Sequence, residues 1–293
     1  MRGLIVENIS NTYKVKIENN ICNCMARGKL KNGELIPVVG DYVEVEILDK
    51  EESKGTIEKI LERKSYIKRP KIANIDQIIF VVSMKNPKPD LLLLDKQLAF
   101  ANFVGVKPLI VLNKIDLDKH QDEVIIEKIY KEIGYTVIKT NAKDGVGLES
   151  LKENLKNKIS AFSGNSGVGK STLINKIFDY ELTQEGIISA KNNRGKNTTT
   201  SIKLYQIDEN SYIADTPGFS TFDVNEIPYK DISKYFTEFD EYITKCEYIG
   251  CSHIKEKNCG VKEALQNEKI SQSRYDNYVK IYKELKDRED HKW

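Results

Sequence analysis

The stretch SGNSGVGKST, residues 163–172, decides how this chain folds around a ligand. It satisfies the pattern G-x-x-x-x-G-K-[ST], and SAFSG supplies a short strand before it and STLINKIF a helix after it. Glycines allow successive backbone N–H groups to point at phosphate oxygens, and the helix N-terminus adds positive potential. We therefore predict a phosphate site in which Lys170 bridges the terminal phosphates and Ser171 holds Mg²⁺. The alternative is a glycine-rich turn that binds nothing.

The tetrapeptide NKID, residues 113–116, follows the buried strand pattern PLIVL. At the carboxyl end of such a strand, side chains face the ligand crevice of an open sheet. Asn113 can bond the guanine edge, Asp116 can accept from the ring N–H and the exocyclic amine together, and Lys114 can lie over the base. Adenine offers no such pair of donors, so the pattern favours guanine and speaks against an ATP-using P-loop kinase.

The segment TNAKDG, residues 140–145, follows the next expected strand. Here the backbone N–H of Ala142 can reach the guanine carbonyl, with Lys143 packed nearby. An ordinary turn after a strand remains an equal alternative for this segment.

Two further segments complete the expected nucleotide site. DTPG, residues 215–218, follows the strand pattern SYIAD, and an aspartate there can hold Mg²⁺ through water while Gly218 senses the γ-phosphate. In RGKNTTTSIK, residues 194–203, a threonine can coordinate Mg²⁺ and make the loop a switch. The threonine run can instead begin a strand.

The motif order is rotated relative to the usual Ras-like order, because the base-reading segments precede the phosphate-binding loop. Strand patterns at 75–84, 107–113 and 135–142 alternate with helical patterns near 90–104 and 122–134. Such alternation predicts an α/β domain with a mostly parallel sheet. We therefore expect a circularly permuted P-loop GTPase domain over residues 67–224, with the sheet unchanged and only the chain breaks moved.

The N-terminal segment, residues 1–66, is a different kind of domain. Short alternating segments separated by turn signals predict a small closed β-barrel, with an OB-fold as the first choice and another small barrel as the alternative. Cys22 and Cys24 alternate in a strand, and we expect them to pack inside it. The run RKSYIKRPK, residues 63–71, carries five basic residues and no acid. It is either an RNA phosphate contact or a solvated linker.

Composition and charge limit the kinds of partner and compartment expected for the chain. The chain has 293 residues and a formal net charge of +2, so any nucleic-acid surface must be local. Its apolar runs are too short for a membrane span, and its N-terminus becomes polar too soon for a signal peptide. Five cysteines, an odd number that falls in two short clusters, indicate a reducing compartment rather than a disulfide framework.

For the last segment, residues 225–293, the sequence predicts a helical zinc-binding domain. Its spacing C-x₄-C-x-H-x₅-C offers three thiolates and one imidazole to one tetrahedral zinc ion, from Cys246, Cys251, His253 and Cys259. Four protein ligands favour a structural over a catalytic ion; the alternative is unliganded thiols in a helical core. Tyr275, Tyr278 and Tyr282 fall at helical spacing, so we expect them to pack, with RNA stacking as the alternative.

The barrel, the rotated motif order and the Cys/His spacing together resemble the RsgA (YjeQ) family of ribosome small-subunit-dependent GTPases. The resemblance covers essentially the whole chain. It implies a cytoplasmic GTPase that docks on the small ribosomal subunit late in its maturation, contacts ribosomal RNA and is stimulated by the subunit. We further expect a monomer with no membrane or DNA partner. It implies that GTP or GDP, Mg²⁺ and one zinc ion are bound. Carried over by motif position, the nucleotide-binding residues are Asn113, Lys114, Asp116, Ala142, Lys143, Gly164, Asn165, Ser166, Gly167, Val168, Gly169, Lys170, Ser171 and Thr172. The magnesium residues are Ser171, Thr199 and Asp215, and the zinc residues are the Cys/His set.

One departure affects catalysis. The family's switch loop usually reads Arg-His-Thr-Thr-Thr, whereas this chain has Lys196-Asn197-Thr198-Thr199-Thr200. Asn197 cannot act as a base, and position 219 is Phe rather than a water-orienting glutamine. We therefore expect hydrolysis by positioning, through Lys170, Thr199, Gly218 and Asn197, with a slow unstimulated rate of roughly 10⁻⁴–10⁻² s⁻¹ or less. The alternative function is an RNA-binding module in which the nucleotide is a non-hydrolysed structural ligand or timer.

Overall fold

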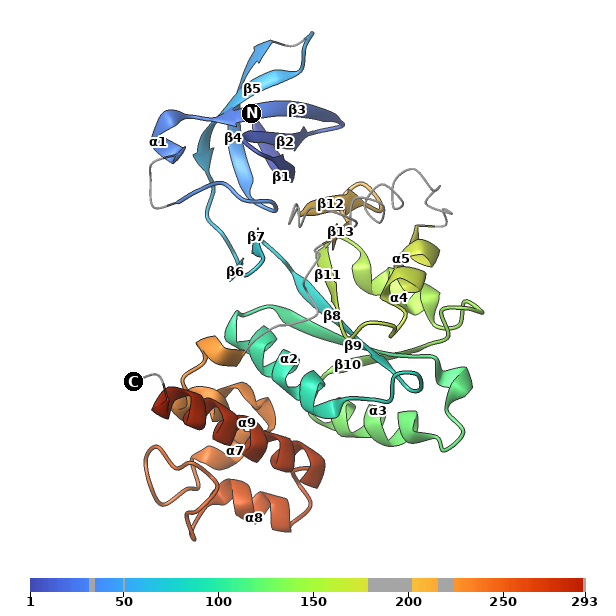
Figure 1. Ribbon diagram of the computed structural model, residues 1–293, viewed down its shortest axis with the longest axis vertical. Helices are drawn as coiled ribbons and strands as arrows, with labels where there is room; N and C mark the ends of the chain where they lie inside the picture. The colour runs from blue at the N-terminus through green and yellow to red at the C-terminus, as the bar shows by residue number, and fades with distance from the viewer. Residues whose placement is uncertain (32–34, 50, 179–201, 216–223, 292–293) are drawn as a thin grey trace.

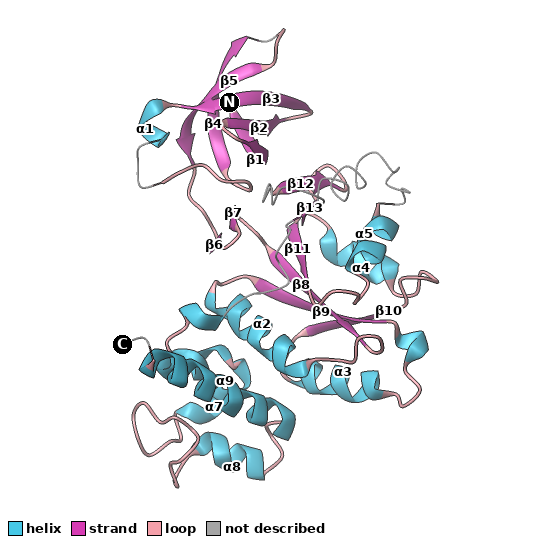
Figure 2. Cartoon of the chain, in the orientation of Figure 1, coloured by secondary structure: helices cyan, strands magenta, loops and turns pink. Residues whose placement is uncertain are grey.

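A computed structural model describes residues 1–31, 35–49, 51–178, 202–215 and 224–291. Three parts follow one another along the chain: a β-barrel, a sheet with helices on both faces, and a mainly helical C-terminal part (Figures 1 and 2). In the described residues no helix is both long enough and apolar enough to cross a membrane.

The barrel consists of five strands in the closed order β1-β2-β3-β5-β4-β1. They are β1 (Arg2–Ile9), β2 (Thr12–Ile17), β3 (Asn20–Ala26), β4 (Tyr42–Asp49) and β5 (Lys54–Ile60), and a short helix α1 (Gly28–Lys31) follows β3. Alternate residues point inward, because a strand has a period of two, and both Cys22 and Cys24 are buried there. The predicted OB-like barrel and the packing role of these cysteines are confirmed.

The middle part has the strand order β10-β9-β8-β11-β13-β12. The first five strands are parallel and β12 is antiparallel. Their bounds are β8 (Gln77–Ser83), β9 (Lys107–Asn113), β10 (Thr136–Thr140), β11 (Ile159–Ser163), β12 (Lys203–Gln206) and β13 (Tyr212–Asp215). Every residue of β8 is buried, as expected of a strand covered on both faces.

Helices cover both faces of this sheet. Ile78 and Phe80 of β8 face the cluster that includes α2 (Leu91–Phe103) and α3 (Asp122–Glu132). The alternate residues Ile79 and Val81 face α4 (Leu148–Leu155) and α5 (Lys170–Ile177). The predicted α/β domain is therefore confirmed, and the strand that precedes each motif ends at the same edge of the sheet (Figure 1).

The basic segment between the first two parts is not a plain linker. It forms a hairpin of β6 (Tyr66–Lys68) and β7 (Lys71–Ala73). The hairpin packs on the fold because Ile67 and Ile72, one from each strand, are both buried. A second link joins the barrel to the middle sheet, where Glu7 of β1 pairs with Lys203 of β12.

The C-terminal part packs on α2 through its last helix (Figure 1). Its elements are η3 (Val224–Glu226), η4 (Tyr229–Tyr235), η5 (Thr237–Phe239), α7 (Asp240–Ile243), α8 (Gly260–Gln266) and α9 (Gln272–Asp290). Tyr278 is buried, and Tyr275 and Tyr282 are partly buried against the core. The predicted packing of the tyrosines on α9 therefore agrees with the structure.

Candidate active site and metal centre

Three sequence motifs meet at the buried side chain of Asn113, which ends β9. Its Nδ2 donates to the carbonyl oxygen of Val168 in the phosphate loop at 2.8 Å. Its Oδ1 accepts from Oγ1 of Thr140 at 3.0 Å and from the backbone N–H of Ala142 at 3.2 Å. Asn113 is 1% exposed, so these bonds form away from water. One amide therefore ties NKID, TNAK and the P-loop into a single pocket wall.

Asn113 and Ala142 are hydrogen-bonded to each other, which limits the bonds that each can make to a base. The Asn113 amide nitrogen carries two hydrogens, and one is used on Val168, which leaves one for a guanine acceptor. The Ala142 N–H predicted to face the guanine carbonyl points to Asn113 in this structure. Lys143 donates its own N–H to Oδ1 of Asn141 at 3.1 Å.

Lys114 and Asp116 lie on the turn that follows β9. Lys114 has a left-handed φ of +63°, and its Nζ donates to the carbonyl oxygens of Gly167, at 2.7 Å, and of Asn86. Asp116 is exposed on η1 (Ile115–Leu117), and no protein partner of its carboxylate is found within the described residues. The lysine thus braces the P-loop, and the carboxylate is free to accept hydrogen bonds from a base.

The phosphate loop itself requires glycine at two positions. Gly164 has φ +137°, and a Cβ there would lie 2.4 Å from the carbonyl oxygen of Val81. Gly169 has φ +102°, and its Cβ would lie 2.3 Å from Nδ2 of Asn113. Any larger residue would therefore push the loop away from the sheet or break the Asn113 contact.

Lys170 begins α5 and folds back over the loop. Its Nζ donates to the carbonyl oxygens of Gly164 at 2.6 Å and Asn165 at 2.9 Å. Burial lowers the pKa of Lys170 from its ordinary value. Ser166, Gly167, Ser171 and Thr172 are exposed along the loop and the first turn of α5, whereas Val168 is buried.

Several predicted catalytic residues lie beyond what the structure describes. Asp215 is the last residue of β13 and pairs with Lys203, which places its backbone at the same sheet edge as the P-loop strand. Asn197, Thr199, Gly218 and Phe219 fall outside the described residues, so their roles stay predictions.

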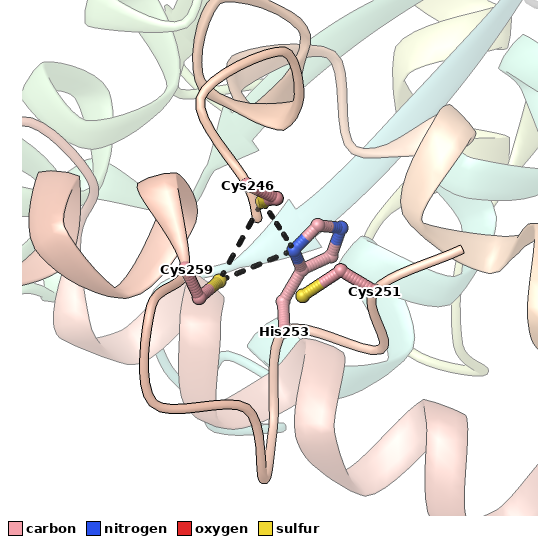
Figure 3. Close-up of side chains that lie close together, drawn as sticks. All are labelled: Cys246, Cys251, His253 and Cys259. Atoms are coloured by element: carbon pink, nitrogen blue, oxygen red, sulfur yellow. Dashed lines mark hydrogen bonds between the residues drawn. The ribbon is translucent and has the colours of Figure 1, made fainter. Parts of the chain in front are cut away.

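The four predicted zinc ligands converge in the C-terminal part (Figure 3). Their ligand atoms all lie within 4.8 Å of one another. Nδ1 of His253 is 3.5 Å from Sγ of Cys246 and 3.3 Å from Sγ of Cys259, and the two sulfurs are 3.9 Å apart. A tetrahedral zinc ion with bonds of about 2.3 Å to sulfur requires sulfurs about 3.8 Å apart, so the donor set fits one such ion.

Neighbouring groups hold this cluster in shape. The hydroxyl of Tyr275 donates to the carbonyl oxygen of His253, and that of Tyr278 to the carbonyl oxygen of Ser252, each at 2.7 Å. Burial would raise the pKa of Glu256, but hydrogen bonds from Ser252 and Ile254 outweigh it and bring the pKa to about 2. Burial raises the pKa of Cys251 to about 12 and lowers that of His253. The loop is thus organised by its own polar contacts as well as by its ligands.

Sequence analysis missed the ion network beneath α2. Arg274 of α9 is 1% exposed and bonds Asp95 of α2 at 2.5 Å, and it bonds Glu238 through two nitrogens at 2.7 and 2.9 Å. Tyr130 and Asn277 also donate to Asp95. A lone acid in the apolar helix LLLLDKQLAFANF was the only sequence signal, and nothing marked Arg274 as its partner.

Comparison with known proteins agrees with this geometry. A family model described as the RsgA N-terminal domain matches residues 2–57, and one described as the RsgA GTPase matches residues 60–225. The chain is 41% identical over 294 residues to a small ribosomal subunit biogenesis GTPase RsgA from Clostridium beijerinckii, covering 100% of both proteins. It is 38% identical to one from Alkaliphilus metalliredigens, covering 97% of this chain and 98% of that one.

Two solved structures share the whole arrangement. YjeQ from Thermotoga maritima is similar with a TM-score of 0.84 at 39% identity, covering 97% of this chain and 98% of that one. YloQ, described as a circularly permuted GTPase, is similar with a TM-score of 0.81 at 32% identity, covering 98% and 95%. The motif order, the fold and these matches agree, and the chain belongs to the RsgA GTPase family.

Proposed function

We propose that this GTPase acts in late maturation of the small ribosomal subunit and that the subunit stimulates its hydrolysis of GTP. Its relatives are named as small ribosomal subunit biogenesis GTPases, which supports the choice of partner. The observation that carries the nucleotide assignment is the Asn113 side chain, which joins both base-reading segments to the phosphate loop.

In this proposal Asp116 selects guanine. Its exposed carboxylate accepts from the two adjacent donors of the base, and the remaining Nδ2 hydrogen of Asn113 donates to a ring nitrogen. Lys114 supports the base while it braces Gly167. The phosphates occupy the loop from Gly164 to Thr172, where Ser166 and Gly167 are exposed and α5 begins.

Lys170 supplies the positive charge at the terminal phosphates. Its contacts to Gly164 and Asn165 pre-position Nζ above the loop, and a phosphate would replace those carbonyl oxygens. Ser171, Thr199 and Asp215 would hold Mg²⁺, which neutralises phosphate charge when bound. Gly218 and Asn197 orient the attacking water. None of these groups is a strong base, so the subunit completes the site.

The three parts divide the work as residues 1–66, 67–224 and 225–293. The barrel and the zinc-binding part contact ribosomal RNA, and the middle part binds nucleotide. Zinc is held by Cys246, Cys251, His253 and Cys259 as a structural ion. The protein acts as a monomer in the cytoplasm.

Single-turnover GTP hydrolysis with and without purified small subunits tests the proposal. We expect the subunit to raise the rate well above the unstimulated level and the Lys170→Ala variant to lose that response. Equal rates with and without subunits would refute stimulation. Normal subunit release by Lys170→Ala would instead favour the RNA-binding module that uses nucleotide only as a structural ligand or timer.

A further inference from the structure

The turn between β6 and β7 concentrates positive charge that the fold itself does not need. Lys68 and Lys71 are direct cross-strand partners, and Arg69 lies between them in the turn. Like charges placed opposite each other destabilise a strand pair. All three side chains are exposed, and we call Lys68, Arg69 and Lys71 the basic turn.

The basic turn has a rigid base. Ile67 and Ile72 are almost fully buried directly below it, and the N–H of Ala73 donates to the carbonyl oxygen of Val39 at 3.0 Å. Gly40 packs so closely that a Cβ there would lie 2.0 Å from the carbonyl oxygen of Ala73. Nδ2 of Asn74 donates to the carbonyl oxygen of Gly40 at 2.8 Å. The hairpin is therefore attached to the barrel, and the backbone that carries its three charged side chains is positioned before any partner arrives.

The cations of this segment differ in their pairing. Arg63 at its start bonds both oxygens of buried Asp41 at 2.7 Å, so its charge is neutralised within the fold. Lys68 pairs with the exposed Glu226 at 3.4 Å. Among the residues that the structure describes, Arg69 and Lys71 form no ion pair. The positive charge at the tip thus remains available to an external anion.

The basic turn also borders an open cleft. Together with Lys68, Arg69 and Lys71, the cleft is lined by Asn8 of the barrel, Ile36 and Val38 of the loop before β4, and Ile202 before β12. Apolar surface and an amide beside several cations suit a sugar and base next to a phosphate chain. An acidic protein segment is the alternative occupant, and measuring affinity for protein-free RNA distinguishes the two.

We propose that the basic turn binds the phosphodiester backbone of RNA in the small ribosomal subunit, with the adjoining cleft taking part of one nucleotide. This inference rests on the proposed function, because it assigns a contact surface to the same partner. Each cation that neutralises a phosphate releases condensed counterions, so binding through the basic turn depends on salt.

The test compares the parent with the triple variant Lys68→Ala/Arg69→Ala/Lys71→Ala. Affinity for purified small subunits, and for protein-free RNA of that subunit, is measured across salt concentration. We expect binding to both to weaken about 10- to 100-fold at 0.1 M salt, and the slope of log affinity against log salt to shrink by about 2–3. The affinity for GDP should stay unchanged and the melting temperature should not fall, since all three side chains are exposed and the variant lacks the like-charged pair.

The matched control removes three exposed lysines on and near α3, Lys119→Ala/Lys128→Ala/Lys131→Ala, and should leave the slope close to that of the parent. An unchanged slope and affinity in the basic-turn variant would overturn the proposal. So would a loss on intact subunits without a loss on protein-free RNA, because the basic turn would then face a ribosomal protein. If the parent itself does not bind subunits, the proposed function fails first and this inference fails with it.

Discussion

Replacing Asn113 with alanine should open the nucleotide pocket. The change removes three buried hydrogen bonds, to Val168, Thr140 and Ala142. At about 1 kcal/mol for each bond, the closed pocket loses about 3 kcal/mol. Since about 1.4 kcal/mol is a factor of ten, GDP affinity should fall roughly 100-fold when measured by isothermal titration calorimetry.

Thr140→Val separates pocket assembly from direct contact with the base. Thr140 is fully buried and its hydroxyl donates to Oδ1 of Asn113, and valine keeps nearly the same shape. Losing this one bond, worth about 1 kcal/mol, should weaken GDP binding about 5-fold and leave the preference for GDP over ADP unchanged. The reasoning is wrong if Thr140→Val binds GDP like the parent while Asn113→Ala loses only its selectivity for guanine.

Four further outcomes are expected. Gly169→Ala should abolish tight GDP binding, because the added Cβ would clash with Nδ2 of Asn113. At Gly105 an added Cβ would have no atom within 4 Å, so the Gly105→Ala protein should bind GDP normally in the same titration. Cys251→Ser should lose the single zinc ion per chain in elemental analysis, and Cys22→Ala, in the barrel, should keep it; one zinc retained in Cys251→Ser would contradict the site. Asp116→Ala should lose its preference for GDP over ADP without a change in melting temperature, and unchanged GDP affinity would remove the basis of the guanine assignment. Arg274→Met should lower the free energy of unfolding by about 3–5 kcal/mol in urea, because Asp95 and Glu238 lose their buried cation. Burial already raises the pKa of Asp95, and the variant lacks the arginine that opposes this shift. A carboxyl group whose pKa is raised in the folded state loses stability as the pH rises above 3.8, its ordinary pKa. The loss of unfolding free energy caused by Arg274→Met should therefore be larger at pH 8 than at pH 5. An equal loss at both pH values would contradict a buried charge on Asp95.

The sequence by itself determined the local chemistry of this protein. The P-loop, NKID and the Cys/His set are each short, and their residue types follow from what phosphate, guanine and zinc require of nearby atoms. The need for glycine at positions 164 and 169 could be predicted for the same reason, because a positive φ within a short loop is a local property. Strand and helix periods then fixed which segments would form the sheet and the barrel.

Only the tertiary structure decided which distant groups meet. Asp95 and Arg274 are 179 positions apart, and their pairing depends on how α9 docks on α2 rather than on either local sequence. The hairpin in the basic segment could not be predicted, because its two buried residues, Ile67 and Ile72, do not form a long periodic run. The use of Asn113 as a junction was hidden as well, because its partners lie 27, 29 and 55 positions away. Contacts of this kind arise when whole helices and strands pack together, so they cannot be predicted from residue spacing along the chain.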